Sequence, residues 1–599
     1  MNTMTQPPSE PAAWLDRMLR WALLLVCGIA LSKGLADPDF WGHVQYGRDV
    51  LASGLPSESN YNYTAVGYRW INHENLAELA FALGVDWLGP GALLLLKCLA
   101  GIGTLWLVLR VAERQGVGQV AAYTGAMLVA ANMMLFWTLR PQLFSFIYFT
   151  AMIALIDRAF ASWQPARPAI RETLWKLAPC VPLFALWTNT HGGFLAGWCV
   201  LVALLGLRAA ESMLAFRRAG SDRAGSCWQA PFGFGAFAVG CGLATLLNPY
   251  GVELHQWLMR SLGEARPEII EWRPPELTLP WAPFWALVAA IAASVFGARQ
   301  RRDWAHLAVV GLTLWQSVEH RRHVVFLSLL FGFWMLPYWD SMLKRLGIGC
   351  DERTIGESLT GGSKRAFGIG LAGVVALLGA TLFQQVRQIP VRHDNYPVDA
   401  FQFITDHRLE GRLLSQLRWG QYAIAAFGKH PDAPADTPRL DVAFDGRFRT
   451  CYPQAVVDQY FDFAEGVHSR FRNRSPDSPP ANETALLNGE PRPNLVLIDR
   501  AMPNAVKVMN GEGDRWVLLY QDRLCQLFGR RDECDDPASK NFVPPAARKI
   551  HGLPNHQISP WPALPRPNAA HTESLARQRA ANLAPAGNAA TRSLKVTES

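Results

Sequence analysis

Residues 91–109 read GALLLLKCLAGIGTLWLVL, an apolar run whose single charged residue is Lys97. A helix needs about twenty apolar residues to cross the hydrocarbon core of a bilayer, and this run has nearly that length. It is therefore predicted to be a transmembrane helix. Comparable segments on both sides of it bring the prediction to about eleven spans, the others being residues 18–36, 119–138, 142–158, 177–190, 194–214, 231–247, 281–298, 304–319, 323–340 and 366–386.

The composition agrees with a membrane protein that also has a polar part. Half of the residues are hydrophobic and only 18% are charged, whereas about a quarter is usual in soluble proteins. The mean hydropathy is only slightly positive, so a water-facing region must offset the apolar segments. The net charge of +8 comes largely from Lys and Arg between apolar segments, which indicates orientation in a membrane and disfavours nucleic acid as a partner.

The distribution of basic residues predicts the orientation. If residues 1–17 are a cytoplasmic N-terminus, alternate loops are rich in Lys and Arg and count as cytoplasmic, while the loops between them are poor in both. The outer loops are then 37–90 and 248–280, within a transmembrane domain of residues 18–389. An odd number of spans places the rest of the chain outside the cytoplasm. The basic residues concerned include Arg110, Arg114, Arg158, Arg217, Arg218, Arg299, Arg301, Lys344 and Arg345.

The chain changes character after the last apolar segment. Residues 390–543 alternate a helix-like stretch, PVDAFQFITDH, with strand-like runs such as GRLLSQL and PNLVLIDR, a pattern typical of a small α/β domain. With the predicted orientation this domain is periplasmic. Residues 544–599 are rich in Pro, Ala, Asn and Arg, a composition that predicts a disordered tail. The predicted fold class is thus a polytopic α-helical membrane protein with a C-terminal extracytoplasmic α/β domain.

The first outer loop opens with two carboxylates at the membrane surface, in the stretch Ala36-Asp37-Pro38-Asp39-Phe40-Trp41-Gly42-His43. Acidic groups this close to hydrocarbon are costly unless they are hydrated, paired or functional. Asp37 and Asp39 are therefore candidates for a general base or a metal ligand. The alternative is helix capping, with Asp37 ending one helix and Asp39 starting the next.

The same loop continues with WINHENLAE, which places His73 beside Glu74 at the predicted start of a helix. His73 could carry a proton or bind a ligand. Glu74 and Glu78 share one helix face and would repel each other unless a cation or solvent lies between them. A solvated amphipathic helix on the membrane surface is the alternative.

Polar residues recur at the outer ends of later helices, and all of them map to the membrane face that carries Asp37 and Asp39. Such convergence predicts a functional cleft at the outer leaflet. The arginines have guanidinium groups suited to phosphate, with ion pairing to Glu271 or Glu319 as the equally weighted alternative. The candidates at these ends are Arg140, Asn189, His191, Glu271, Arg321 and Arg322.

These blocks resemble the bacterial membrane glycosyltransferases of the GT-C superfamily, in particular relatives of the protein mannosyltransferases and lipid A sugar transferases. Asp37-Pro38-Asp39-Phe40-Trp41-Gly42-His43 is similar to the acidic motif that this superfamily places in its first outer loop. WINHENLAEL, LRPQLFSF, WTNTHGGFLAG, LNPYG and EWRPP are similar to recurring blocks of a multi-spanning subfamily. The resemblance covers the membrane half of the chain.

The resemblance implies a hexosyl- or pentosyltransferase of the bacterial cytoplasmic membrane. Its donor would be a polyprenyl-phosphate sugar, and its acceptor a glycan, lipid or protein on the outer face. Asp39 is the first choice for the base and Asp37 the second, because the mannosyltransferase motif is an adjacent Asp-Glu pair and here a proline separates two aspartates. Some members use a divalent cation, Mg²⁺ or Mn²⁺, near this motif. By the same resemblance Arg321 or Arg322 would hold the donor phosphate, and the guanidinium of Arg140 is a further candidate for it. The candidates for contact with substrate are His43, His73, Glu74, Asn189, His191 and Glu271.

Two other functions stay open on the sequence. A transporter or flippase for a lipid-linked or anionic solute could line a path with the same side chains, but it would place polar residues in mid-membrane and broken helices in paired halves, and neither is evident. A non-catalytic envelope assembly protein could use the outer domain to bind a partner. Convergence of the polar helix ends on one place favours the enzyme.

Overall fold

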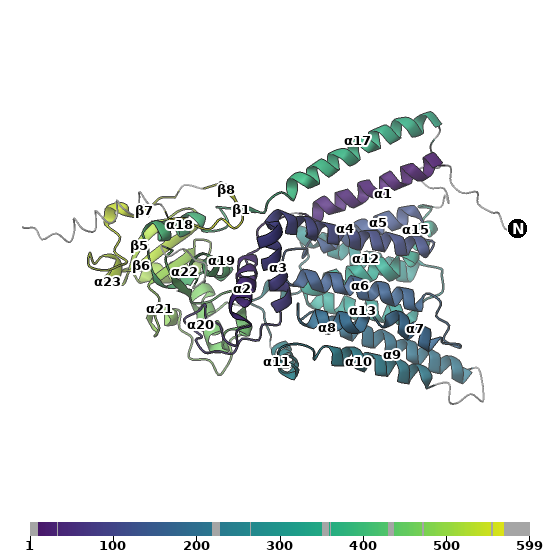
Figure 1. The fold of residues 1–599 in the computed structure, drawn as a ribbon, viewed down its shortest axis with the longest axis horizontal. Coiled ribbons are helices and arrows are strands. Elements are labelled where there is room, and N and C mark those ends of the chain that lie inside the picture. The colour runs from purple at the N-terminus through teal and green to yellow at the C-terminus, as the bar shows by residue number, and fades with distance from the viewer. Residues whose placement is uncertain are drawn as a thin grey trace, which may run out of the picture. The chain divides into compact units, whose positions relative to one another are not determined.

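The computed structural model describes residues 10–32, 34–218, 228–263, 265–349, 359, 361–428, 437–469, 472–552 and 555–567 (Figure 1). The chain divides into two compact units. We call the first the helical unit, which comprises Met1–Asp37, Tyr46–Arg48 and Asn72–Ile389. The second is the sheet unit, which comprises Pro38–Gln45, Asp49–Ile71 and Pro390–Ser599.

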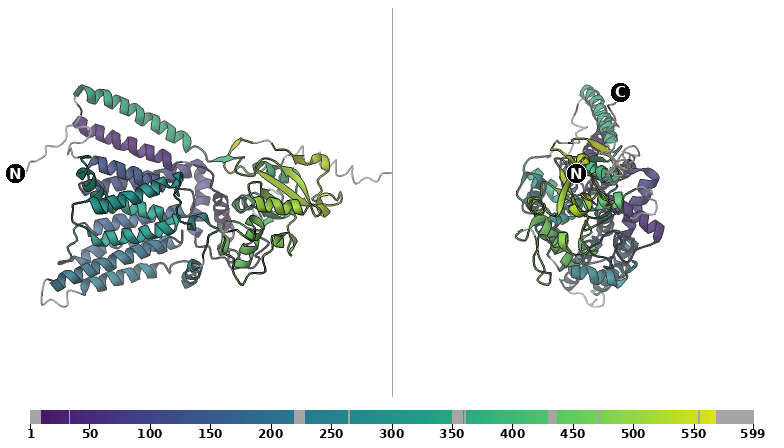
Figure 2. Two further views of the ribbon diagram at one scale, coloured as in Figure 1. Left: turned by 180° about the vertical axis from the view of Figure 1, so that it is seen from behind. Right: turned by 90° about the vertical axis from the view of Figure 1, so that its left-hand side faces the viewer.

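The helical unit is a bundle of helices joined by short connections. α1 packs against α17 and α4, α9 packs against α10, and α12 packs against α15; α1 and α17 lie side by side in every view in which both are clear (Figure 2). The helices are α1 (Glu10–Leu31), α3 (Asn75–Leu88), α4 (Pro90–Arg114), α5 (Gln119–Met133), α6 (Gln142–Phe160), α7 (Ile170–Leu177), α8 (Cys180–Thr188), α9 (Phe194–Arg218), α10 (Gln229–Ala244), α11 (Val252–Leu262), α12 (Ala282–Gly297), α13 (Trp304–Glu319), α14 (Val324–Leu330), α15 (Leu336–Arg345) and α17 (Gly361–Gln385), with short turns η2 (Ile270–Trp272), η3 (Leu279–Trp281), η4 (Arg321–His323) and η5 (Phe331–Met335).

Each predicted apolar segment is occupied by helix. In the described part of the chain, six stretches are long and apolar enough to cross a membrane by length and composition. Helices also occupy the other five segments; α5, α8, α10 and α13 are shorter, and α1 carries the charged residues Asp16, Arg17 and Arg20. The six stretches are Pro90–Arg114, Gln142–Phe160, Phe194–Arg218, Leu279–Gly297, Arg321–Arg345 and Gly362–Gln385.

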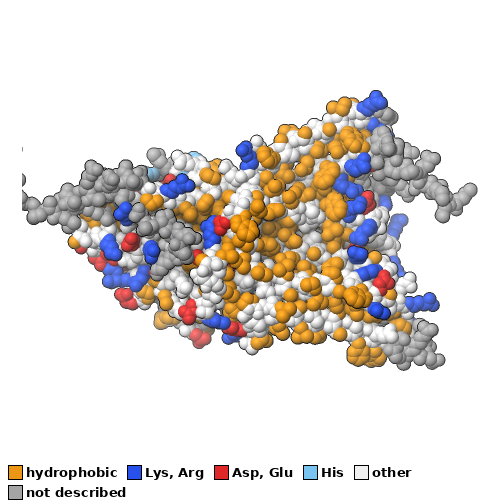
Figure 3. All heavy atoms as spheres, viewed as in Figure 1, with side chains coloured by type: hydrophobic (Ala, Val, Ile, Leu, Met, Phe, Trp, Pro, Cys, Tyr) orange, Lys and Arg blue, Asp and Glu red, His pale blue; other side chains and the backbone are white. Residues whose placement is uncertain are grey.

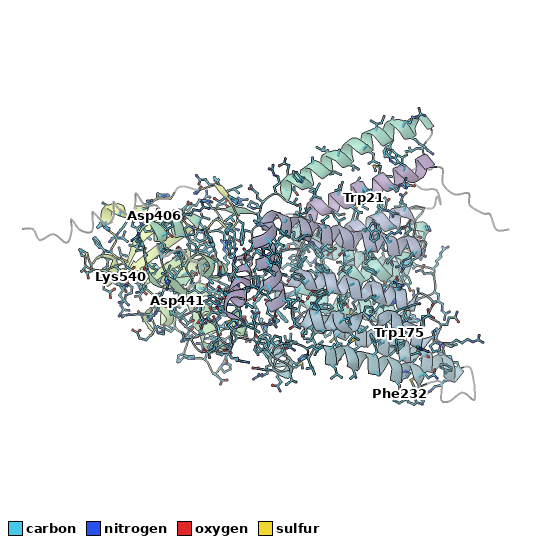
Figure 4. The ribbon with its side chains drawn as sticks, viewed as in Figure 1. Trp21, Trp175, Phe232, Asp406, Asp441 and Lys540 are labelled. Atoms are coloured by element: carbon cyan, nitrogen blue, oxygen red, sulfur yellow. The ribbon has the colours of Figure 1, made fainter. Side chains whose placement is uncertain are left out.

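The surface of the helical unit is apolar along the helices. Trp21, Trp175 and Phe232 are exposed there and are labelled in Figure 4, whereas the side chains labelled on the sheet unit in the same figure are charged. Figure 3 shows hydrophobic side chains covering the visible sides of the helices, with Lys and Arg gathered at one end. A surface of this extent without charge is matched to lipid, because contiguous apolar patches of this size are rare on soluble monomers.

The sheet unit contains a mixed six-stranded sheet with the strand order β3-β2-β4-β6-β5-β7. β3, β2 and β4 are parallel, β6 is antiparallel to both β4 and β5, and β7 is parallel to β5. A separate antiparallel pair joins β1 to β8. The strands are β1 (Pro390–Arg392), β2 (Gly411–Ser415), β3 (Leu440–Val442), β4 (Leu495–Asp499), β5 (Trp516–Gln521), β6 (Cys525–Arg530), β7 (Lys549–Ile550) and β8 (Ile558–Pro560), and the helices are α18 (Val398–Asp406), α19 (Leu417–Phe427), α20 (Gln454–Glu465), α21 (Ala485–Asn488), α22 (Pro503–Gly511) and α23 (Arg531–Cys534).

This arrangement confirms the predicted fold class, a membrane-type helical bundle followed by an α/β domain. Each predicted strand-like run begins with or contains an observed strand, because its alternating apolar residues can be buried on one face of the sheet. β4 is buried along its whole length, as expected for a central strand covered on both faces.

Part of the first predicted outer loop folds with the sheet unit. It contains α2 (Phe40–Ser53), whose Trp41 packs against Tyr396, Tyr422 and Trp561 at centroid distances of 4.8, 4.8 and 6.2 Å. Burying such aromatic area is a strong driving force. Further along, the backbone of Tyr61 and Tyr63 exchanges hydrogen bonds of 3.0 and 3.2 Å with Val442 at the end of β3.

The tail predicted to be disordered from residue 544 is in part structured. Its first residues form η7 (Pro545–Ala547), β7 and β8, and Trp561 is 95% buried, with only 5% of its surface exposed. Two strand pairings and one buried indole supply the stabilisation that composition alone did not reveal. Residues 568–599 lie outside the described residues.

Candidate active site

Asp37, in the segment between α1 and α2, forms the start of a chain of charges in the helical unit. Both of its carboxylate oxygens accept from Nε of Arg140 at 2.7 Å. Nη1 of Arg140 in turn donates to Oε1 of Glu271 at 3.0 Å. Arg140 therefore makes the ion pair with Glu271 that the sequence offered as an alternative to phosphate binding, and it binds Asp37 as well.

Arg321 is committed to structural contacts. Its Nη2 donates to Glu276 at 2.7 Å and its Nε to the carbonyl of Pro274 at 3.1 Å. Its guanidinium lies over the ring of Trp281 at 4.9 Å, and only 8% of its side chain is exposed. The side chain thus fixes the segment between η2 and η3 to the start of α14.

Arg322, the next residue, is placed differently. Its guanidinium lies 4.6 Å from the ring centroid of Trp272 and interacts electrostatically with Glu271 and Glu74. Within the described residues it makes no side-chain hydrogen bond, so its donors remain available for a ligand. Arg322 links the charges at Asp37, Arg140 and Glu271 to those around Glu74.

His191 is held in one tautomer. Its Nδ1 accepts from the backbone N–H of Gly193 at 3.0 Å and contacts Oγ of Ser145 at 2.7 Å, while Ser145 Oγ itself accepts from Nε1 of Trp187 at 2.7 Å. Ser145 therefore donates its hydroxyl hydrogen to Nδ1, and the ring carries its own hydrogen on Nε2. That Nε2 lies 3.9 Å from Oε1 of Glu74.

Close packing around His191 explains the glycine at position 193. A Cβ at Gly193 would lie 2.4 Å from Ser145 Oγ and 2.9 Å from His191 Nδ1, so only glycine permits the contact that sets the tautomer. Nothing in the local sequence indicated the role of Ser145, which comes from α6, 46 residues before His191. Trp187 lies at the end of α8, in the same sequence block as His191.

Glu74 lies between two histidines, with His73 Nε2 also 3.9 Å from its Oε1. His73 packs against the ring of Trp257 at 5.2 Å. Asn189 has a different role, because its Nδ2 donates to the carbonyls of Ala185 and Leu247 at 2.8 Å. Asn189 thus connects two helix ends through hydrogen bonds.

Glu78, one turn after Glu74, is buried and accepts from Nδ2 of Asn72 at 2.6 Å. The backbone N–H of Asn72 donates to the hydroxyl of Tyr250 at 3.0 Å. This network connects the first outer loop to the LNPYG block. Among the helical-unit candidates, Asp37, Arg140 and Glu271 form one set of ion pairs, and Glu74 lies near both His73 and His191. Arg322 interacts electrostatically with Glu271 and Glu74, and Arg321 and Asn189 make supporting contacts.

Asp39 and His43 belong to the sheet unit. Asp39 occupies the N-cap position of α2, but its side chain makes no capping hydrogen bond, so capping does not explain this carboxylate. His43 is buried in the first turn of α2, 7% exposed. The Asp39 carboxylate lies instead against Gly446 in the turn after β3, where a Cβ would come within 2.3 Å of its Oδ1.

The turn that contains Gly446 carries a buried ion pair. Asp445 is fully buried and accepts from Nε and Nη2 of Arg447 at 2.8 and 2.7 Å, and from the hydroxyl of Tyr452 at 2.5 Å. Burial alone would raise the pKa of Asp445, but the charge and hydrogen bonds of Arg447, together with Tyr452, hold this pKa below its usual value. Asp445 is therefore ionised and fixed.

The comparisons with known proteins found similarity at the level of structure. No family model matches the chain. No curated protein matches it. The apo structure of ArnT from Cupriavidus metallidurans is 12% identical, with a TM-score of 0.48, and the match covers 87% of this chain and 98% of that chain. The oligosaccharyltransferase of Archaeoglobus fulgidus, tethered to an acceptor peptide containing the NVT sequon, is also 12% identical, with a TM-score of 0.47 and coverage of 81% and 70%.

Further matched structures contain lipid phosphates. One is ArnT bound to undecaprenyl phosphate, 12% identical with a TM-score of 0.44, covering 86% of this chain and 98% of that one. The chain is similar to these proteins at this level, and the function proposed below rests on its own residues.

Proposed function

We propose that the chain is a membrane glycosyltransferase that moves a hexosyl or pentosyl group from a polyprenyl-phosphate carrier to an acceptor hydroxyl. The observation that carries the proposal is the connected set of opposite charges at helix ends in the helical unit, which runs from Asp37 through Arg140, Glu271 and Arg322 to Glu74. Ionisable groups are costly beside a membrane, and a linked cluster of them is expected where substrate binds.

Arg322 is the proposed ligand of the carrier phosphate. Charge develops on the leaving phosphate during transfer, and a guanidinium with unused donors stabilises it. Arg140 and Arg321 already donate to Asp37, Glu271 and Glu276. These contacts support Arg322 over the other two arginines as the main phosphate ligand.

Asp39 is the proposed base. An acceptor hydroxyl is a poor nucleophile, and a carboxylate that takes its proton in the transition state accelerates the attack. Asp37 is less suited, because both of its oxygens already accept from the guanidinium of Arg140. Chain connectivity keeps Asp39 within about 7 Å of Asp37 between Cα atoms.

A divalent cation is a further part of this proposal. Carboxylate oxygens are the ligands that Mg²⁺ and Mn²⁺ prefer, and in the helical unit Glu74 and Glu78 would supply them. Asp37 fits this role less well, since both of its oxygens accept from Arg140. A bound cation would neutralise phosphate charge.

The proposed orientation places the charge cluster outside the cytoplasm of a bacterial cell. Arg140, His191 and Arg322 precede the first turns of α6, α9 and α14. α6, α9 and the stretch Arg321–Arg345, which contains α14 and ends with α15, end with basic residues, as expected for cytoplasmic ends. The sheet unit, which follows the last span, would be periplasmic. The basic residues at those ends are Arg158, Arg217, Arg218, Lys344 and Arg345.

The test is transfer from radiolabelled polyprenyl-phosphate sugars by the purified protein in lipid vesicles, with and without Mg²⁺ or Mn²⁺. Release or transfer of label by the wild type, and its loss in Asp39→Asn, would support the proposal. If a broad donor panel gives no turnover while a labelled lipid or solute crosses the vesicle membrane, the chain is a transporter instead.

A further inference from the structure

Gly446 and Gly42 allow two segments about 400 residues apart in sequence to meet within the sheet unit. A Cβ at Gly446 would lie 2.3 Å from Asp39 Oδ1 and 2.9 Å from Gln421 Nε2. A Cβ at Gly42 would lie 2.0 Å from Gln421 Oε1. Real side chains do not approach a Cβ this closely, so Gly446 is required for the observed position of Asp39 and Gly42 for that of Gln421.

The turn Phe444–Arg447 is rigid. The buried Asp445–Arg447 pair closes it, and the Arg447 N–H also donates to Asp445 Oδ1 at 3.0 Å. The next residue, Phe448, has φ of 47°, a left-handed conformation that a non-glycine residue holds only where its surroundings fix it. The surface that Gly446 presents is thus set by a buried framework.

The first outer loop is attached to this turn on its other side. The Arg447 guanidinium lies over the rings of Tyr61 and Trp70, at 5.2 and 4.8 Å, and Thr64 donates to the carbonyl of Ala443 at 2.5 Å. Cation–π contacts with buried guanidinium groups contribute about 2 kcal/mol each. Both the start of the loop, at Asp39, and its later part contact the same turn.

We propose that the Phe444–Arg447 turn positions the Asp39 carboxylate, which makes the sheet unit a working part of the transfer machinery. Gly446 and Asp445 are positioning residues, and Asp39 is the catalytic residue. The proposal rests on the proposed function and assigns to the C-terminal domain a task within it. It differs from a binding module, which could be altered at this turn without changing the chemical step.

The test substitution is Gly446→Ala, whose new Cβ must displace Asp39. Its matched control is Gly513→Ala, in the same unit, where nothing lies within 4 Å of an added Cβ. We expect Gly446→Ala to lower kcat about tenfold to a hundredfold, as for a catalytic group misplaced by about 1 Å. The KM for the carrier-linked sugar should stay within about twofold, because the phosphate ligand is untouched.

A double-mutant cycle separates positioning from general damage. In the Asp39→Asn background, Gly446→Ala should change the residual rate by less than about twofold, since the group it misplaces no longer acts as a base. An equal loss in both backgrounds, or no loss in either, would overturn the proposal. If Asp39→Asn keeps full transfer, Asp39 is not the base and the positioning role fails, while glycosyl transfer stands.

A second measurement does not depend on activity. Amide hydrogen exchange over residues 38–45 of the full-length protein should be faster in Gly446→Ala than in wild type and unchanged in Gly513→Ala. Unaltered exchange in Gly446→Ala would show that the turn does not hold this segment and would refute the inference. A wild type that transfers no sugar from any donor refutes the proposed function, and the exchange result still decides whether the turn holds Asp39.

Discussion

Asp37 and Asp39 are two residues apart in one motif, yet they belong to different parts of the molecule. In the helical unit, Asp37 accepts two hydrogen bonds from Arg140, whose charge is shared with Glu271. In the sheet unit, Asp39 lies against Gly446, beside an Asp445–Arg447 pair that is satisfied within its own turn. The same side chain is thus an ion-pair partner in one region and a positioned carboxylate in the other.

The comparison shows how neighbouring carboxylates acquire different chemistry. Both oxygens of Asp37 accept from one guanidinium, so this carboxylate is occupied by an ion pair. Asp39 lies against the turn after β3, where we propose that it acts as the base. The difference lies in the elements that each aspartate contacts, because the local sequence around both is the same.

The largest expected effect comes from removing the negative charge of each aspartate in turn. We expect Asp39→Asn to lower transfer about 10²- to 10⁴-fold, the usual contribution of a general base. Asp37→Asn should lower it less, through a displaced Arg140. Steady-state transfer by both variants in the same vesicles measures the ratio. A larger loss for Asp37→Asn would reverse the assignment of the base.

A second prediction tests how much the buried Asp445–Arg447 pair contributes to stability. Asp445→Ala leaves a buried guanidinium without its partner, and this should cost about 3–5 kcal/mol of unfolding free energy in the sheet unit. Urea-induced unfolding of the full-length protein in detergent, followed by pulse proteolysis, measures this cost. Asp514→Ala, at an exposed position of the same unit, is the control and should stay close to wild type. Equal midpoints for the two variants would show that the buried pair does not hold the turn.

A third prediction separates the two neighbouring arginines. Arg322→Gln should raise the KM for the carrier-linked sugar about 10- to 100-fold, as expected for a lost hydrogen bond to a charged phosphate. Arg321→Gln should leave that KM nearly unchanged and lower the thermal midpoint, because it removes the contacts to Glu276 and Pro274. The opposite pattern would assign the phosphate to Arg321.

The smallest expected effect is a loss of stability of the sheet unit at low pH. For Asp445 and Asp399, burial raises the pKa, but hydrogen bonds and nearby positive groups outweigh it, so the pKa of each is lower in the folded protein. The stabilisation that these two ionised carboxylates contribute is complete above their unfolded pKa of about 3.9. It is lost as the pH falls from there through their lower pKa in the folded protein. Thermal unfolding between pH 3 and pH 7 measures it. The decrease in the thermal midpoint between pH 7 and pH 3 should be smaller in Asp399→Asn than in wild type. An equal decrease in both would contradict this role of Asp399.

Much of the fold could be predicted from the sequence, because the apolar runs and the strand-like alternation depend only on local composition. The convergence of Arg140, Glu271 and His191 was also expected, since each stands at a helix end on one predicted membrane face. Their individual contacts could not be predicted. Arg321 and Arg322 are adjacent and chemically identical, and only the direction of each side chain decides that Arg321 pairs with Glu276 while Arg322 lies over Trp272.

The sequence by itself determined the membrane-spanning character, the α/β domain after the last span and the acidic motif in the first outer loop, because periodicity and charge are local properties. Only the tertiary structure decided that Asp37 pairs with Arg140, that Ser145 and Trp187 set the tautomer of His191, and that Asp39 meets Gly446. The physical reason is that these contacts join segments tens to hundreds of residues apart, and close approach depends on packing that no local pattern records.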